Sequence, residues 1–147
     1  AACPPLDLNS RYAYLLICRD FADTSVVATA GRRLLGAITA YRPQGRPDTL
    51  FVWQVAVAPA ARGQGLARRM LDHLLARPVL RDIAWVEATV GPGNQASQRL
   101  FAGLAEARGT GRSRRTLFGR SVLGAGHEPE VLHRVGPLQP AGLLEAV

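Results

Sequence analysis

The segment Arg62-Gly63-Gln64-Gly65-Leu66-Ala67 decides the fold, because it joins a run typical of a strand to a run typical of a helix. Residues 50–57 (LFVWQVAV), before it, are rich in β-branched and aromatic side chains, and Pro59 ends the run. After it, apolar residues recur at three- and four-residue spacing as far as Leu75, and Pro78 follows. This periodicity predicts an amphipathic helix that begins at Gln64.

The turn between strand and helix has the properties of an anion site. Glycine lets the backbone approach a ligand closely, because no Cβ stands in the way. The first N–H groups of the helix have no partner within it and lie at the positive end of the helix dipole. With Arg62 adding charge, the segment predicts a turn that holds a pyrophosphate.

Two common phosphate-binding turns do not fit this segment. A P-loop requires a lysine, and all 18 basic residues of the chain are arginines. A dinucleotide fingerprint requires Gly or Ala three residues after its second glycine, where this chain has Arg68. The pattern Arg62-x-x-Gly65-x-Ala67 remains, and the segment alone leaves open an ordinary glycine-rich turn that caps a helix.

The bulk composition predicts a single domain over residues 1–147, with 48% hydrophobic and 20% charged residues. The longest apolar run, residues 50–61, is too short for a membrane span, and no basic-then-apolar leader opens the chain. Two cysteines do not make a disulfide framework, so we expect reduced thiols in the cytoplasm. The net charge of +7 favours an anionic partner.

The order of predicted elements is that of an α/β protein with a mixed sheet. Strands are expected at residues 26–29, 34–41, 50–57, 83–90 and 131–135, and a second helix after the N-cap Asn94. Residues 109–115 are interpreted as basic and irregular, and residues 117–123 as strand or helix. Alternation predicts one face of the third strand with Phe51, Trp53, Val55 and Val57, and the opposite face with Val52, Gln54 and Ala56.

A second motif follows the fourth predicted strand, at the start of the second predicted helix: Asn94-x-x-Ser97-x-x-Leu100-Phe101. Both motifs together resemble the GNAT acetyltransferase family. The resemblance implies a mixed, mostly antiparallel sheet flanked by helices, its first strand missing from this chain, and acetyl-CoA as co-substrate with no metal. It also implies cofactor contacts at Val55, Ala56, Val57, Arg62, Gly63, Gln64, Gly65, Leu66, Ala67, Asn94, Ser97 and Phe101.

Four further segments are similar to the L-2,4-diaminobutyrate acetyltransferases of ectoine biosynthesis, a GNAT subfamily. They are residues 4–14, 48–57, 86–90 and 127–137. This resemblance implies acetylation of the 4-amino group of L-2,4-diaminobutyrate by a homodimeric bacterial enzyme of osmoprotection. It implies substrate contacts at Asp7, Tyr12, Trp53, His127 and Glu130.

The residue types suit such a reaction. A carboxylate can hold the ammonium group that should not react, and aromatic rings can stack against a cation. Glu87, His127 or Glu130 is expected to accept the proton of the reacting amine, and a backbone N–H near Val55 to stabilise the oxyanion. Many GNAT proteins place a tyrosine acid where this chain has Phe101, which leaves solvent or another tyrosine, such as Tyr41, for that role.

Several alternatives stay open at this stage. The acceptor can be another small amine or a protein N-terminus. The arginines between residues 108 and 120 can serve a basic RNA-binding module, although we expect no nucleic-acid partner. Asp7 can simply cap a helix that starts at Leu8, and Trp53 can be a core residue. The chain also looks short before Ala1 and within residues 109–120, compared with the family it resembles.

Overall fold

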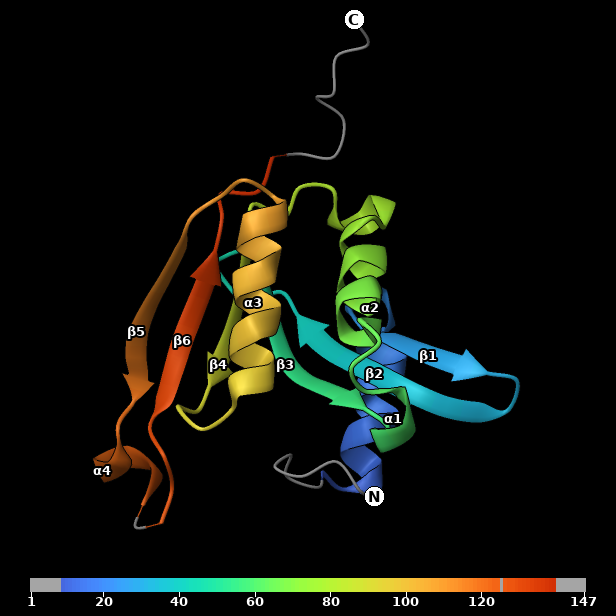
Figure 1. Cartoon of the computed structure of the whole chain (residues 1–147), viewed down its shortest axis with the longest axis horizontal. Helices are drawn as coiled ribbons and strands as arrows, with labels where there is room; N and C mark the ends of the chain where they lie inside the picture. The colour runs from blue at the N-terminus through green and yellow to red at the C-terminus, as the bar shows by residue number, and fades with distance from the viewer. Residues whose placement is uncertain (1–8, 125, 140–147) are drawn as a thin grey trace, which may run out of the picture.

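Six strands form one sheet in the computed structural model, which describes residues 9–124 and 126–139 (Figure 1). The strands are β1 (Val26–Ala30), β2 (Arg33–Tyr41), β3 (Thr49–Val57), β4 (Trp85–Val90), β5 (Arg112–Phe118) and β6 (Glu130–Val135). The helices are α1 (Arg11–Asp20), α2 (Leu66–Leu75), α3 (Gln95–Ala107) and α4 (Arg120–Leu123), with 3-10 turns η1 (Ala22–Thr24), η2 (Pro59–Ala61) and η3 (Pro78–Leu80).

The strand order is β1-β2-β3-β4-β6-β5, and every neighbouring pair is antiparallel except β3 and β4. Parallel neighbours need a long crossover, and the segment with α2 provides it. The predicted mixed, mostly antiparallel sheet flanked by helices is therefore confirmed.

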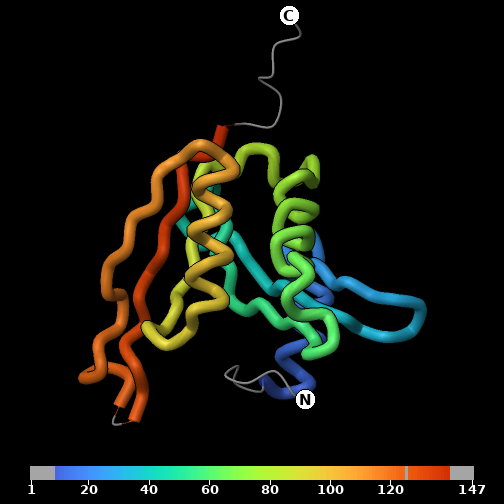
Figure 2. The backbone as a smooth tube through the Cα atoms, viewed as in Figure 1, coloured from blue at the N-terminus to red at the C-terminus, as the bar shows by residue number. Residues whose placement is uncertain are grey.

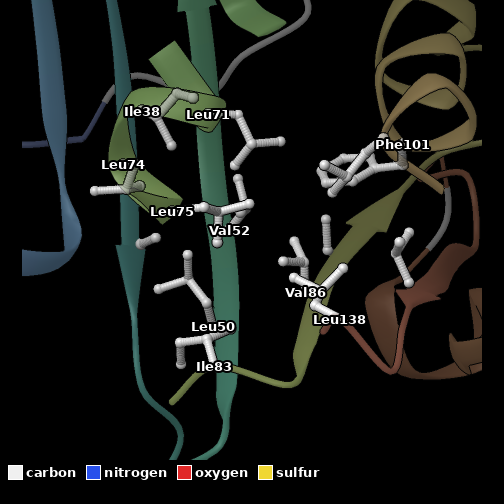
Figure 3. Close-up of a cluster of buried hydrophobic side chains, with 14 of the residues drawn as sticks. Ile38, Leu50, Val52, Leu71, Leu74, Leu75, Ile83, Val86, Phe101 and Leu138 are labelled. Atoms are coloured by element: carbon white, nitrogen blue, oxygen red, sulfur yellow. The ribbon is translucent and has the colours of Figure 1, made fainter. Parts of the chain in front are cut away.

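Helices α2 and α3 lie side by side on one face of the sheet (Figure 1). Helix α2 buries Met70, Leu71, Leu74 and Leu75, the apolar stripe that the sequence predicts. These side chains meet Ile38, Leu50, Val52 and Val86 from the sheet in one core (Figure 3). Each fully buried leucine contributes about 1.5–3 kcal/mol, so this face holds the two helices firmly in place.

Helix α1 lies on the opposite face of the sheet (Figure 1), where Ile17 lines a cavity together with residues of β2 and β3. Its N-cap is Ser10, whose hydroxyl accepts a hydrogen bond from the Ala13 N–H at 3.1 Å. Helix α1 therefore begins at Arg11. The alternative of a helix that starts at Leu8 falls on residues outside the described ranges. Ile17 is its one buried residue, so much of α1 is exposed. Asp7 lies outside the described residues.

Residues 109–115 were expected to be irregular, and this expectation is wrong for residues 112–115. Residues 112–118 form β5, which pairs with β6 along its whole length at the edge of the sheet. Its first five residues are arginines and small polar residues, so this exposed edge strand has almost no hydrophobic pattern. Residues 117–123 divide between the end of β5 and the short helix α4.

A bulge in β3 contradicts the predicted faces of that strand. Thr39 pairs with Gln54 and Ala40 with Val52, so Trp53 is an extra residue without a partner in the register. One extra residue reverses the alternation beyond it. Val55 and Val57 therefore pack against the same core as Val52, instead of sharing a face with Trp53.

Candidate active site

Strands β3 and β4 separate where the two predicted motifs meet. Among the described residues their ladder has three pairs and ends at Phe51 and Glu87. Beyond that point the two strands diverge (Figure 2). The second half of β3 thus has a strand neighbour, β2, on one side and a gap on the other.

In the turn after β3, two glycines have positive φ values and two side chains hydrogen-bond to backbone carbonyls. Gly63 and Gly65 have φ values of +73° and +70°, a conformation that residues with a Cβ rarely adopt. Arg62 Nε donates to the Val57 carbonyl at 3.1 Å, and Gln64 Nε2 donates to the Ala60 carbonyl at 3.1 Å. Gly65 is the N-cap of α2 and has no side chain to satisfy the first N–H groups, which leaves them available to an anion.

A cavity of about 410 Å³ lies between this turn, the end of β3 and the start of α3. Ten of the twelve residues predicted to contact the cofactor line it. They are Val55, Ala56, Val57, Arg62, Gly63, Gly65, Leu66, Ala67, Asn94 and Ser97. The end of β3, the N-terminus of α2 and the N-terminus of α3 therefore line one cavity.

Gln64 and Phe101 do not line this cavity. The Gln64 side chain is turned back to the Ala60 carbonyl within the loop. Phe101 is 1% exposed and points from α3 into the core, with its ring centroid 6.4 Å from that of His133 (Figure 3). Four lining residues were missed: Ala61, Ala96, Arg99 and Leu100. Of these, only Leu100 lay in the quoted motif.

A second cavity, of about 480 Å³, opens on the face that carries α1. Its lining is largely aromatic, and Trp53 belongs to it with half of its surface exposed. The other lining residues are Ile17, Phe21, Thr39, Ala40, Tyr41, Phe51, Thr89 and Phe118. Residues of β3 up to the bulge at Trp53 therefore line the second cavity, and residues of β3 after the bulge line the first.

The residues expected to bind the acceptor are only partly gathered here. Glu130, half-buried at the start of β6, is the cross-strand partner of Phe118 in the second cavity. Tyr12 is 70% exposed on α1 and lines neither cavity. His127 is exposed in the loop before β6, where its backbone N–H donates to the Gly124 carbonyl at 3.4 Å.

The surroundings of Glu87 do not suit a general base, because its carboxylate is buried and paired with arginines. It is 1% exposed, and its carboxylate accepts from Arg46 Nη1 at 2.5 Å and lies 3.5 Å from Arg134 Nε. Arg134 in turn stacks over the ring of Trp85, 3.9 Å from its centroid. Both oxygens of Glu87 are thus engaged by guanidinium groups, and neither cavity is lined by this residue.

The profile of the Acetyltransferase (GNAT) family matches residues 2–104. The chain belongs to the GNAT acetyltransferase family.

Relatives that are about half identical to this chain are named L-2,4-diaminobutyric acid acetyltransferase. The chain is 54% identical over 137 residues to an L-2,4-diaminobutyric acid acetyltransferase of Bordetella parapertussis, covering 92% of this chain and 74% of the relative. It is 51% identical to that of Streptomyces coelicolor, covering 93% of this chain and 82% of the relative. The structure of diaminobutyrate acetyltransferase EctA from Paenibacillus lautus, with its substrate L-2,4-diaminobutyric acid and coenzyme A, aligns with a TM-score of 0.86. Its sequence identity is 41%, over 90% of this chain and 81% of that one.

A buried histidine, His133, lies next to Phe101, the position where many GNAT proteins have a tyrosine. His133 is 2% exposed, and its Nδ1 has no hydrogen-bond partner among the described residues. Burial lowers the pKa of His133 below its usual value, and the nearby charges of Arg112 and Arg114 lower it further. His133 is therefore held neutral beside Phe101.

Within residues 9–124 and 126–139, no group of three or more His, Cys, Asp and Glu side chains lies close enough to hold a metal ion. The helices in the same ranges are all too short or too polar to cross a membrane.

Proposed function

We propose that this protein transfers an acetyl group from acetyl-CoA to the 4-amino group of L-2,4-diaminobutyrate. The observation that carries the proposal is the pair of cavities on the two sides of the Trp53 bulge, where β3 parts from β4. One cavity suits a long phosphate-bearing cofactor and the other a small cation. The similarity to diaminobutyrate acetyltransferases supplies the identity of the acceptor.

The first cavity fits acetyl-CoA. The glycine turn and the N-terminus of α2 would bind the pyrophosphate, and Arg62 would add charge at the rim. Val55 to Val57, along the gap in the sheet, would hold the arm that carries the thioester. A backbone N–H near Val55 would stabilise the oxyanion of the tetrahedral intermediate.

The second cavity would take the diamino acid. Trp53 offers a ring face to an ammonium group, and Glu130 beside Phe118 offers a carboxylate. We keep Glu130 and His127 as candidates for accepting the amine proton, directly or through water. Glu87 is less suited, because its carboxylate is engaged by Arg46 and Arg134. The amine would attack the thioester directly in a ternary complex, so no acyl-enzyme is required.

The finer expectations are part of the same proposal. They are a role in ectoine biosynthesis, a cytoplasmic location, a homodimer, and substrate contacts from Asp7 and Tyr12. The names of the relatives support the first of these. The exposed apolar side chains around the second cavity, Phe21, Trp53 and Phe118, fit a surface that another copy of the chain partly covers.

The test is a measurement of CoA release with acetyl-CoA and a panel of amines, namely L-2,4-diaminobutyrate, ornithine, lysine and a peptide with a free N-terminus. We expect the highest kcat/KM for diaminobutyrate, with NMR of the product showing acetylation at the 4-amino group. Equal turnover of ornithine or of the peptide would overturn the acceptor and favour the broader alternative of a GNAT enzyme for another amine.

The alternative of an RNA-binding module has less support. Its arginines lie partly in β5, where Arg112 donates to the Gln98 carbonyl at 3.1 Å and so ties the strand to α3. The region carries one exposed aromatic, Phe118, and Phe118 faces the second cavity. Salt-sensitive RNA binding by a protein that does not bind acetyl-CoA would be required to restore this alternative.

A further inference from the structure

Arg99 stands at the rim of the first cavity with an unengaged charge. It lies on α3, its side chain is exposed, and it lines the cavity. Among the described residues, no hydrogen bond or ion pair holds its guanidinium. By contrast, Arg68 on the facing helix pairs with Asp72 at 2.7 Å.

Helix α3 presents two strips of residues to this cavity. Asn94, Ser97 and Leu100 are half-buried and form the inner strip, at a spacing of three residues. Ala96 and Arg99 are exposed and form the outer strip, next to solvent. A ligand arm deep in the cavity would follow the inner strip, and a charged group at the rim would meet Arg99.

On the side opposite to Arg99, Arg62 lines the cavity, and Arg69 lies near the start of α2; the backbone of the turn engages both side chains. Arg62 Nε donates to the Val57 carbonyl, and Arg69 Nη1 donates to the Gln64 carbonyl at 2.5 Å. Among the described residues, neither of these arginines, nor Arg99, forms an ion pair with a carboxylate. The rim is therefore positive on both sides, with Arg99 the arginine that has no protein partner there.

Acetyl-CoA presents two separate phosphate groups to such a rim. Its pyrophosphate matches the N–H groups of the turn at Gly65. Its 3′-phosphate is a monoester with close to two negative charges at neutral pH, and a second positive group at the rim would stabilise it. On the proposed function, and assuming the pyrophosphate at the turn, we propose that Arg99 binds the 3′-phosphate. Arg99 would then make the protein discriminate CoA from 3′-dephospho-CoA.

The test compares CoA and 3′-dephospho-CoA by isothermal titration calorimetry at low ionic strength, without an acceptor amine. The variants are Arg99→Gln and the matched control Arg32→Gln, in the exposed turn between β1 and β2. We expect the wild-type protein to bind CoA about tenfold more tightly than dephospho-CoA, as a charge-assisted hydrogen bond at a solvated rim allows. Arg99→Gln should weaken CoA alone, to within about twofold of dephospho-CoA, and Arg32→Gln should keep the wild-type preference.

Two results would overturn the assignment. Equal affinity of the wild-type protein for the two ligands would show that no 3′-phosphate subsite exists. Equal weakening of both ligands by Arg99→Gln would place Arg99 on the pyrophosphate instead. Thermal unfolding of each variant checks that the fold is kept. Because binding is measured without acceptor, CoA discrimination by a protein that does not acetylate diaminobutyrate would support the subsite while refuting the proposed acceptor.

Discussion

Replacing Gly65 by glutamate tests the proposed phosphate turn most directly. Gly65 caps α2, has a φ of +70°, and lines the first cavity. The one atom within 4 Å of an added Cβ is Arg69 Nη1, at 3.8 Å. The free protein therefore has room for a side chain, and the substitution acts through backbone strain and through charge.

The two effects have different sizes. A residue with a Cβ in the left-handed conformation costs roughly 1–2 kcal/mol, which lowers Tm by roughly 2–8 °C in a chain of this size. For the charge, two unit charges about 5 Å apart at an effective dielectric constant of about 20 repel by about 3 kcal/mol, a loss of more than a hundredfold in affinity. The charge effect should therefore dominate the loss of CoA binding.

Three variants separate these contributions in calorimetric titrations with CoA. Gly65→Ala carries the strain without the charge and should weaken CoA only several-fold. Gly31→Glu adds the same charge at a φ of +56° in the β1–β2 turn, with no atom within 4 Å, and should lose stability but bind CoA normally. Gly65→Glu should show no measurable binding. If Gly65→Glu kept an affinity within about twofold of the wild type, the phosphate would not lie at this turn.

Three further substitutions probe the rest of the site. Trp53→Ala should raise the KM for diaminobutyrate about tenfold and leave that for acetyl-CoA unchanged in steady-state assays; a reversed pattern would remove Trp53 from the acceptor pocket. Glu87→Gln should lower the free energy of unfolding by about 2 kcal/mol in urea titrations, because two guanidinium groups lose their counter-charge; a large fall in kcat at unchanged stability would instead reinstate Glu87 as the base. His133 has a lowered pKa in the fold, so its stability contribution is present above pH 6.5 and is lost as pH falls below that value, where the unfolded chain takes up the proton first. The Tm of His133→Leu should accordingly fall less between pH 7.5 and pH 5.5 than that of the wild type, and an identical fall would contradict the buried, neutral histidine.

The glycine turn at residues 62–67 and the helices beside it were predictable because their signals are local. Glycine at positive φ, apolar spacing in α2 and an N-cap at Asn94 are each set by a few neighbouring residues. The structure keeps all three, with the Asn94 side chain accepting from the Ser97 N–H at 3.1 Å. Phe101 was expected to contact the cofactor from its motif position alone, and its side chain is buried in the core instead.

The bulge at Trp53 and the strand β5 were not predictable in the same way. A bulge depends on how β2 pairs with β3, and the sequence of the nine-residue strand β3 does not indicate which residue is the extra one. Strand β5 is stabilised by its partner β6, because its own arginine-rich sequence has no apolar face. Both features need contacts between distant parts of the chain.

The sequence by itself determined the turn at residues 62–67, the two helices that follow the turn motifs, and the class of the sheet. These depend on backbone preferences and on periodicity, which neighbouring residues decide. Only the tertiary structure decided that β3 and β4 part beyond Phe51, that Trp53 and Val55 serve opposite cavities, and that Glu87 is engaged by two arginines. The reason is physical: strand register, burial and ion pairing arise between residues far apart in the chain, and no local pattern specifies them.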